Sequence, residues 1–132
     1  QEGLIHVETE GDIVTVRRTI RDVAKALCFG ITDVTRIVTA ASELTRNIYV
    51  YANEGNVRWR IVNSGYERGL ELVFEDQGPG ISDLALAQEE GYSTGGGLGL
   101  GLPGARRLMD EMEIESEVGQ GTTVTLRKWL RR

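Results

Sequence analysis

The chain has 132 residues, about the length of one domain. Forty per cent of the residues are hydrophobic and 27% are charged, as in folded water-soluble proteins. The net charge of −5 disfavours a nucleic-acid partner, and no apolar run approaches the ~20 residues of a membrane span. We therefore expect a single domain over residues 1–132, located in the cytoplasm, with neither a nucleic acid nor a membrane as its partner.

The small numbers of cysteine, histidine and lysine residues exclude several kinds of active site. Cys28 is the one cysteine, so a disulfide framework and a cysteine-based metal site are excluded. His6 is the one histidine, which nearly excludes a multi-histidine zinc site and a Ser-His-Asp triad. Neither of the two lysines, Lys25 and Lys128, stands in the GxxxxGK(S/T) pattern of a P-loop.

The first half of the chain predicts one strand followed by two helices. Leu4–Glu8 alternates as a strand does. Asp12 can cap a helix that Gly30 ends, and Thr32 can cap a second helix that runs to about Ala52. The apolar positions recur every three or four residues: Ile13, Val16, Ile20, Val23 and Leu27 in the first helix, and Ile37, Ala41, Leu44, Ile48 and Tyr51 in the second.

The second half predicts strands around a glycine-rich centre. Three apolar-striped helices and about five strands fit an α+β two-layer sandwich, with the helices on one face of a mixed sheet. The further elements are strands over Val57–Val62 and Leu70–Glu75, a short helix near Leu84–Glu90, a third helix from Pro103 to about Met109, and strands over Glu113–Val118 and Thr122–Leu130.

A carboxylate and an amide stand four residues apart on the second predicted helix. Glu43 and Asn47 therefore share one face, beside the apolar stripe. A carboxylate can deprotonate a nucleophile, and an amide oxygen is a hard ligand suited to Mg²⁺. Taken alone, this motif is better explained as two polar residues on a solvated helix face, since most exposed polar pairs have no special role.

An acidic residue and two glycines follow the predicted strand over Leu70–Glu75. Asp76 stands at the end of this strand, and Gly78 and Gly80 come directly after it. The carboxylate can accept a hydrogen bond from an exocyclic amine such as that of adenine, and the glycines allow a planar ring to approach the backbone. An ordinary turn between strand and helix has a similar composition.

A glycine-rich segment precedes the third predicted helix. Free backbone N–H groups and the positive end of a helix dipole bind phosphates well, and so many glycines predict a loop that its ligand orders. The candidate phosphate contacts are Ser93, Thr94, Gly95, Gly96, Gly97, Leu98, Gly99, Leu100 and Gly101.

The same segment contains a GxGxxG pattern at Gly99–Gly104. A dinucleotide site of the Rossmann type requires a strand directly before this pattern and an acidic residue about 20 residues after it within a βαβ unit. A polar glycine run precedes the pattern here and 28 residues follow it, so an NAD-binding oxidoreductase is disfavoured.

The order of these motifs carries more weight than any one of them. E-x-x-x-N on a helix precedes D-x-G-x-G after a strand, then G-x-G-x-G before a helix, then a Gly-x-Gly-Thr-Thr run at 119–123. This succession resembles the GHKL ATPase/kinase superfamily, which has the Bergerat fold, over about residues 32–127. Glu43 and Asn47 resemble its N box, Asp76–Gly80 its first glycine box and Gly97–Gly101 its second.

The resemblance implies ATP and Mg²⁺ as cofactors and gives each motif a role. Asp76 would bind adenine, with Thr122 assisting through a water and Thr123 as the less suitable candidate. Asn47 would hold Mg²⁺, and Glu43 would be the general base. The remaining nucleotide contacts would come from Gly78 and Gly80 and from the segment Ser93–Gly101.

Within this superfamily the chain resembles the switch serine/threonine kinases of the bacterial stressosome, in the segments Ser42–Ala52, Glu75–Ile81 and Gly96–Glu111. This likeness implies a kinase that phosphorylates STAS-domain antagonist proteins and, once released from them, activates a downstream phosphatase. Arg46 departs from the small residue common at this position in anti-sigma kinases. An anti-sigma factor and a non-enzymatic nucleotide-gated binding module are the alternatives.

Overall fold

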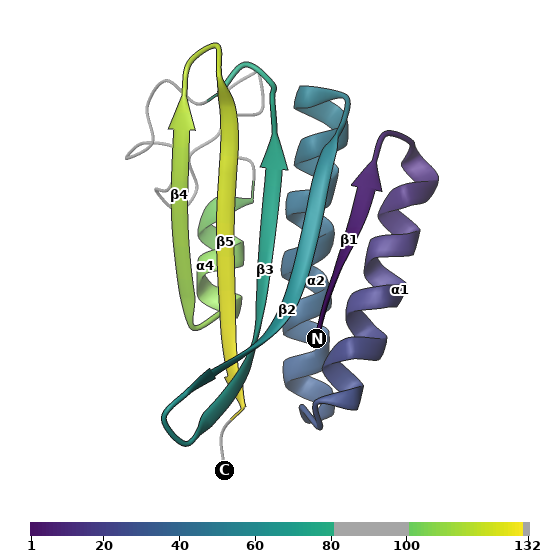
Figure 1. Cartoon of the computed structure of the whole chain (residues 1–132). Helices are drawn as coiled ribbons and strands as arrows, with labels where there is room; N and C mark the ends of the chain where they lie inside the picture. The colour runs from purple at the N-terminus through teal and green to yellow at the C-terminus, as the bar shows by residue number, and fades with distance from the viewer. Residues whose placement is uncertain (81–100, 131–132) are drawn as a thin grey trace.

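Five alternating segments pair into one sheet in the computed structural model, which describes residues 1–80 and 101–130. The sheet order is β1-β2-β3-β5-β4, and all four neighbouring pairs are antiparallel (Figure 1). The expected mixed sheet is thus corrected to an antiparallel one. Two helices connect β1 to β2, and short turns connect β2 to β3 and β4 to β5. After each of these three connections the chain runs in the opposite direction, so the paired strands are antiparallel. The strands are Glu2–Val7 (β1), Gly55–Ser64 (β2), Glu67–Asp76 (β3), Glu111–Glu117 (β4) and Gly121–Leu130 (β5).

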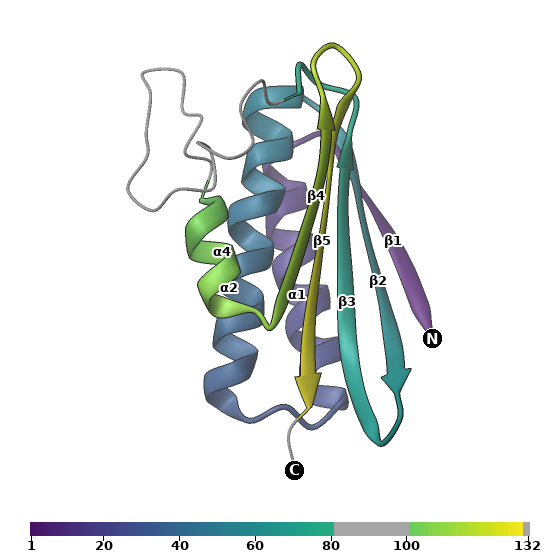
Figure 2. The same cartoon turned by 90° about the vertical axis from the view of Figure 1, so that its left-hand side faces the viewer.

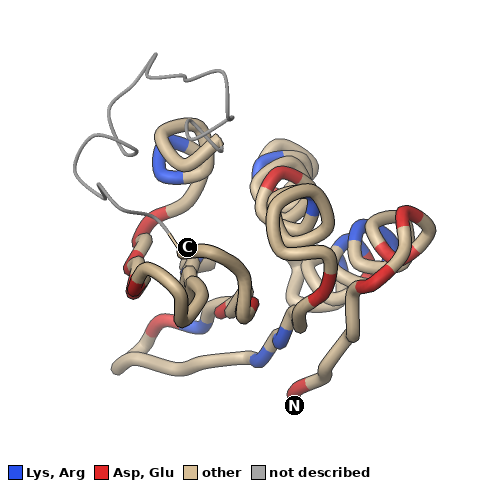
Figure 3. Tube along the Cα trace, turned by 90° about the horizontal axis from the view of Figure 1, so that it is seen from above, with Lys and Arg blue, Asp and Glu red and all other residues tan. Residues whose placement is uncertain are grey.

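The described α-helices lie on one face of this sheet, as predicted, and Figure 2 and Figure 3 show the two layers from the side and end-on. No helix in the described part of the chain is long and apolar enough to cross a bilayer. The helices are α1 (Glu10–Ala26), α2 (Ile31–Asn47) and α4 (Leu102–Leu108), and α2 continues into a π-helical turn, η1 (Ile48–Ala52).

Both long helices begin earlier than predicted. The Thr9 hydroxyl accepts from the Asp12 N–H at 3.3 Å, and the Asp12 carboxylate accepts from the Thr9 N–H at 2.9 Å. This reciprocal capping box makes Thr9 the cap of α1 and places Asp12 in its first turn. Gly30 rather than Thr32 caps α2, and Cys28 takes the left-handed backbone after α1, with φ 71°.

Strands β2 and β3 are both longer than predicted, at each of their ends. β2 begins at Gly55 and not at Val57, and β3 begins at Glu67 and not at Leu70, so that Gly65 and Tyr66 alone form the turn between the two strands. The third predicted helix is confirmed as α4. The short helix expected near Leu84–Glu90 lies outside the described residues.

The core lies where the helical stripes meet the inner face of the sheet. Ile20 of α1 and Ile37 of α2 are fully buried, as are Leu72 of β3 and Leu126 of β5. Each buried side chain of this size stabilises the fold by ~1.5–3 kcal/mol. Tyr51 is 40% exposed although it belongs to the predicted stripe, because the wider π-helical turn of η1 moves it off that line.

No described helix covers the outer face of the sheet (Figure 2 and Figure 3). This face carries a network of ion pairs. Glu71 is 4% exposed, and its carboxylate oxygens lie 2.6 Å from Arg60 Nε and 2.8 Å from Arg127 Nε. Arg127 also donates to Glu111 and Glu113 on β4. Burial by itself raises the pKa of Glu71, but the two guanidinium groups hold it below its ordinary value. This Glu71 network joins four strands across the sheet.

Candidate functional site

Asp76 ends β3 and lies between two other strands. Its backbone pairs with Gly55 of β2 on one side and with Thr122 of β5 on the other. The carboxylate Oδ1 accepts from the Gly78 N–H at 2.8 Å, and the Thr122 backbone N–H also donates to this carboxylate. Burial raises the pKa of the Asp76 carboxyl above its ordinary value, and these two N–H groups only partly oppose the rise. The result is a half-buried acceptor at the end of a strand.

The two glycines after Asp76 allow close packing of the loop. A Cβ on Gly78 would lie 2.6 Å from the Ala52 Cβ at the end of η1. Gly80 has φ 75°, and a Cβ there would collide with the carbonyl oxygen of Glu117. The loop is therefore held between η1 and β4, which is a packing reason for both glycines in addition to the predicted approach of a ring.

Thr122 lies on the same face of the sheet as Asp76, because residues directly opposite each other in a pair share a face. Thr123 lies opposite Glu75 and so faces the other way, which favours Thr122 as the adenine partner. The Thr122 hydroxyl lies 2.8 Å from the Ser116 hydroxyl of β4, and Ser116 also donates to a backbone carbonyl at 3.2 Å. A surface depression at this end of the sheet includes Asp76, Ser116 and Thr122 in its lining.

Ser116 is the residue of this site that the sequence analysis missed. Nothing in its local sequence marks it, since it stands in an alternating strand of acidic and apolar residues. The signal that could have found it is the register of the β4–β5 hairpin, which places it directly opposite Thr122.

Glu43 and Asn47 occupy the last turns of α2. The Glu43 side chain is exposed and the Asn47 side chain is half-buried. Gly101, which precedes α4, has φ 69°, and a Cβ on it would lie 2.9 Å from Glu43 Oε2. The start of α4 is therefore in contact with the proposed base, and the neighbouring Leu102 is buried in the core. From Ser93 to Leu100 the predicted phosphate contacts lie outside the described residues.

The π-helical turn η1 connects the two halves of the site. It begins directly after Asn47 and ends at Ala52, which packs against Gly78. A side chain on Gly55 would lie 2.8 Å from Ile48 Cγ2, so the start of β2 passes close beneath the same turn. Single π-helical turns occur frequently at functional sites.

Lys128 stabilises the C-terminal end of α4. Its Nζ donates to the Leu108 carbonyl oxygen at 2.9 Å and lies 3.6 Å from Asp33 Oδ1 and 3.8 Å from Asp110 Oδ1. The side chain is buried. This lysine therefore secures the end of α4 and is held away from Glu43.

Comparison with known proteins identifies the family of the chain. The family model of the histidine kinase-like ATPase domain matches residues 7–128. The chain belongs to the histidine kinase-like ATPase family. It is 49% identical to the serine/threonine-protein kinase RsbT of Bacillus subtilis over 130 residues, 98% of each chain. It is 33% identical to the anti-sigma F factor of Halalkalibacterium halodurans, covering 74% of this chain and 70% of that one.

Solved structures with the same fold have little sequence in common with this family member. The RsbU and RsbW domains of Rv1364c from Mycobacterium tuberculosis match with a TM-score of 0.58 and 22% identity, over 96% of this chain and 31% of that one. The catalytic domain of the histidine kinase ThkA matches with a TM-score of 0.55 and 14% identity, over 96% and 97%. These likenesses show the fold alone.

The predicted fold and family are thereby confirmed. By its likeness to RsbT the chain is a protein serine/threonine kinase, and the family is one that uses ATP. The structure brings Asp76 and Thr122 together, and Glu43 together with Gly101. The chemical roles of these residues stay predictions.

Proposed function

We propose that this kinase transfers the γ-phosphate of ATP to serine or threonine residues of STAS-domain antagonist proteins and, once released, activates a downstream effector phosphatase. The observation that carries the proposal is the 49% identity to RsbT, which extends over 98% of both chains. The anti-sigma F factors among the similar proteins support a role in partner switching. The substrate and the effector follow from the resemblance to stressosome switch kinases.

The adenine end of ATP would bind at Asp76. An ionised carboxylate has about four acceptor positions, of which the Gly78 and Thr122 N–H groups use two. The others remain for the exocyclic amine of adenine and for a water. Ser116 supports this arrangement because its hydrogen bond fixes the rotamer of the Thr122 hydroxyl, which would bind the same water.

Asn47 would hold the Mg²⁺ that accompanies ATP. Its amide oxygen is a hard ligand, and the residue lies at the end of α2, where η1 leads to the Asp76 loop. The ion, when bound, neutralises phosphate charge. The segment Ser93–Gly101 would contact the phosphates through backbone N–H groups, because neither lysine of the chain stands in a P-loop pattern.

Glu43 would accept the proton of the substrate hydroxyl. The oxygen of that hydroxyl forms a bond to the γ-phosphorus, the bond from the γ-phosphorus to the bridging oxygen breaks, and ADP leaves. Two features support this role: the side chain is exposed to an incoming protein, and it contacts Gly101 at the end of the proposed phosphate loop. Phosphoryl transfer depends mainly on positioning and charge stabilisation, so one placed carboxylate is sufficient.

An anti-sigma factor is the second candidate, and the 33% identity to an anti-sigma F factor favours it. In that case the chain would bind a sigma factor and use ATP to change partners.

The test is transfer of labelled γ-phosphate to a purified STAS-domain protein and to its serine-to-alanine variant, with Mg²⁺ present. We expect label on the former only, and transfer that falls by roughly 10²–10⁴-fold in Glu43→Gln while ATP still binds. Asp22→Asn, a change at an exposed acid of α1, is the matched control and should transfer normally. ATP binding without transfer to any STAS protein would refute the kinase proposal, and tight binding of a sigma factor would then support the second candidate.

A further inference from the structure

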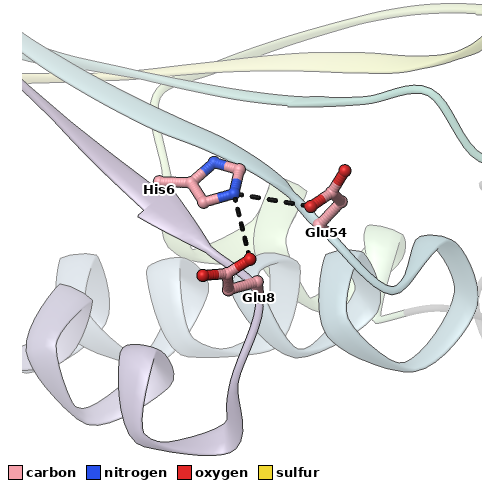
Figure 4. A group of neighbouring side chains, drawn as sticks. All are labelled: His6, Glu8 and Glu54. Carbon is pink, nitrogen blue, oxygen red and sulfur yellow. Dashed lines mark ion pairs between the residues drawn. The ribbon is translucent and has the colours of Figure 1, made fainter.

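Three side chains with metal-binding atoms meet on the outer surface, two from the start of the chain and one from far along the sequence (Figure 4). His6 belongs to β1, Glu8 to the link between β1 and α1, and Glu54 to the link between η1 and β2. His6 Nε2 lies 3.7 Å from Glu8 Oε2 and 3.5 Å from Glu54 Oε2. All three side chains are exposed, so an ion can reach them from solvent.

The imidazole ring is oriented by a fourth residue. Asn56 lies directly opposite His6 in the β1–β2 pair, and its Oδ1 lies 3.0 Å from His6 Nδ1. Because the amide oxygen can only accept, Nδ1 carries the proton, and in the neutral ring Nε2 presents its lone pair toward the two carboxylates. Protein metal sites commonly fix a histidine ligand in this way, through a hydrogen bond from its other nitrogen.

The backbone of each carboxylate is also held. The Glu8 N–H donates to the Asp12 carboxylate of the α1 capping box at 2.9 Å. Glu54 follows Asn53, which has a left-handed backbone with φ 69° and ends η1. The three ligands are thus presented by a strand, a capped helix start and a tight helix end.

We propose that His6, Glu8 and Glu54 form a Zn²⁺ site, with a water as the fourth ligand. Zinc bonds of 2.0–2.2 Å at tetrahedral angles place neighbouring ligand atoms about 3.4 Å apart. The two N–O separations here exceed this value by only a few tenths of an ångström, and the three ligand atoms all lie within 4.8 Å of one another. Small side-chain rotations would therefore complete the coordination.

The donor set selects zinc over the Mg²⁺ of the kinase. Imidazole suits zinc and similar transition metals, whereas Mg²⁺ prefers oxygen ligands alone. The two carboxylates of Glu8 and Glu54 beside the ring give the cluster a negative charge that attracts a cation. The neighbouring Asp12 carboxylate also interacts electrostatically with His6, and it accepts from two backbone N–H groups.

The site is independent of the proposed phosphoryl transfer but adjacent to its scaffold. Glu54 precedes Gly55, whose backbone pairs with Val7 on one side and Asp76 on the other. A bound ion would link the start of β2 to the start of α1. Zinc binding can therefore be tested whether or not the chain transfers phosphate.

The experiment is calorimetric titration of the full chain with Zn²⁺ in a Cys28→Ser background, since Cys28 is an exposed thiol at the opposite end of α1. We expect one ion per chain, visible absorption typical of tetrahedral coordination when Co²⁺ replaces Zn²⁺, and no competition from Mg²⁺. His6→Ala and Glu54→Gln should each weaken binding by at least about 10–100-fold. Glu2→Gln, at an exposed acid of β1 outside the proposed site, should bind normally.

Asn56 supplies a second comparison. Asn56→Ala should weaken zinc binding by about 10–100-fold because the ring is no longer oriented, whereas Asn56→Asp keeps an acceptor and should retain the affinity. Every variant changes an exposed or half-buried polar residue, and unchanged circular dichroism would show that it folds. Absence of zinc binding in the Cys28→Ser chain, or equal binding in His6→Ala and Glu2→Gln, would overturn the proposal and leave the cluster as an ion pair of protonated histidine.

Discussion

Replacing Asp76 with asparagine should separate folding from nucleotide binding. Burial raises the pKa of this carboxyl, so its ionised form is disfavoured in the folded protein without nucleotide. The uncharged asparagine removes that desolvation cost. We therefore expect Asp76→Asn to leave the melting temperature of the nucleotide-free protein unchanged or to raise it.

ATP binding, by contrast, should become weaker in Asp76→Asn. The carboxylate already accepts from the Gly78 and Thr122 N–H groups, and an asparagine has one acceptor atom and one donor group. If its oxygen keeps the backbone bonds, its NH₂ group faces the amine of adenine, so one charge-assisted hydrogen bond is lost. Such a bond contributes about 1.5–3 kcal/mol, which corresponds to a roughly 10–100-fold weaker Kd.

The measurements are thermal unfolding without nucleotide and calorimetric titration with Mg·ATP. Glu75→Gln is the matched control, because this neighbouring acid lies on the other face of β3 and pairs with Arg58 at 2.8 Å. It should bind ATP normally. A lower melting temperature combined with unchanged ATP affinity in Asp76→Asn would refute the reasoning, since the carboxylate would then be a structural group alone.

Three further variants test other parts of the molecule. Asn47→Ala should weaken Mg·ATP binding, whereas Glu43→Gln should bind it and fail in transfer; equal loss of binding in both, measured by calorimetry, would show that the roles are divided wrongly. Ser116→Ala should weaken ATP binding about 3–10-fold, because one neutral hydrogen bond of ~1 kcal/mol no longer fixes Thr122; a calorimetric Kd equal to that of the wild type would contradict this. Glu71→Gln should lower the unfolding free energy at pH 7 by about 1–3 kcal/mol, less than for a fully buried pair because one arginine is largely exposed. The pKa of Glu71 is depressed on folding, so its contribution is present above its unfolded pKa of about 4.3 and is lost at lower pH; a difference between wild type and variant that persists in urea titrations well below pH 4 would contradict the assignment.

The sequence predicted the elements better than their ends. Helical stripes and alternating strands depend on side-chain periodicity, which one sequence displays directly. Helix starts depend on which of several polar residues forms the cap: Thr9 and Asp12 both qualify, and only the reciprocal hydrogen bonds show that Thr9 is the cap. Similarly, Cys28 takes the left-handed position that Gly30 would adopt at less cost, because the packing of α1 against α2 decides where the turn falls.

The candidate site was predictable where its residues form local motifs. Glu43 and Asn47 are a helical pair, and Asp76 heads a glycine loop, so spacing along the chain identifies them. Ser116 and the cluster around His6 depend instead on contacts between distant segments. Those contacts require the strand order and register, which periodicity alone does not fix.

The register also explains why these features gather at one end of the sheet. A single row of directly opposed residues crosses all five strands: Val7, Gly55, Asp76, Thr122 and Ser116. Asp76, Thr122 and Ser116 therefore share one face, and a slip of one residue in either pair would turn a partner to the opposite face. The next row begins at His6 and Asn56 and presents its side chains to the other face. The adenine site and the zinc site that we propose thus lie in adjacent rows, on opposite faces of the sheet. The strand register therefore fixes the positions of the residues in both sites.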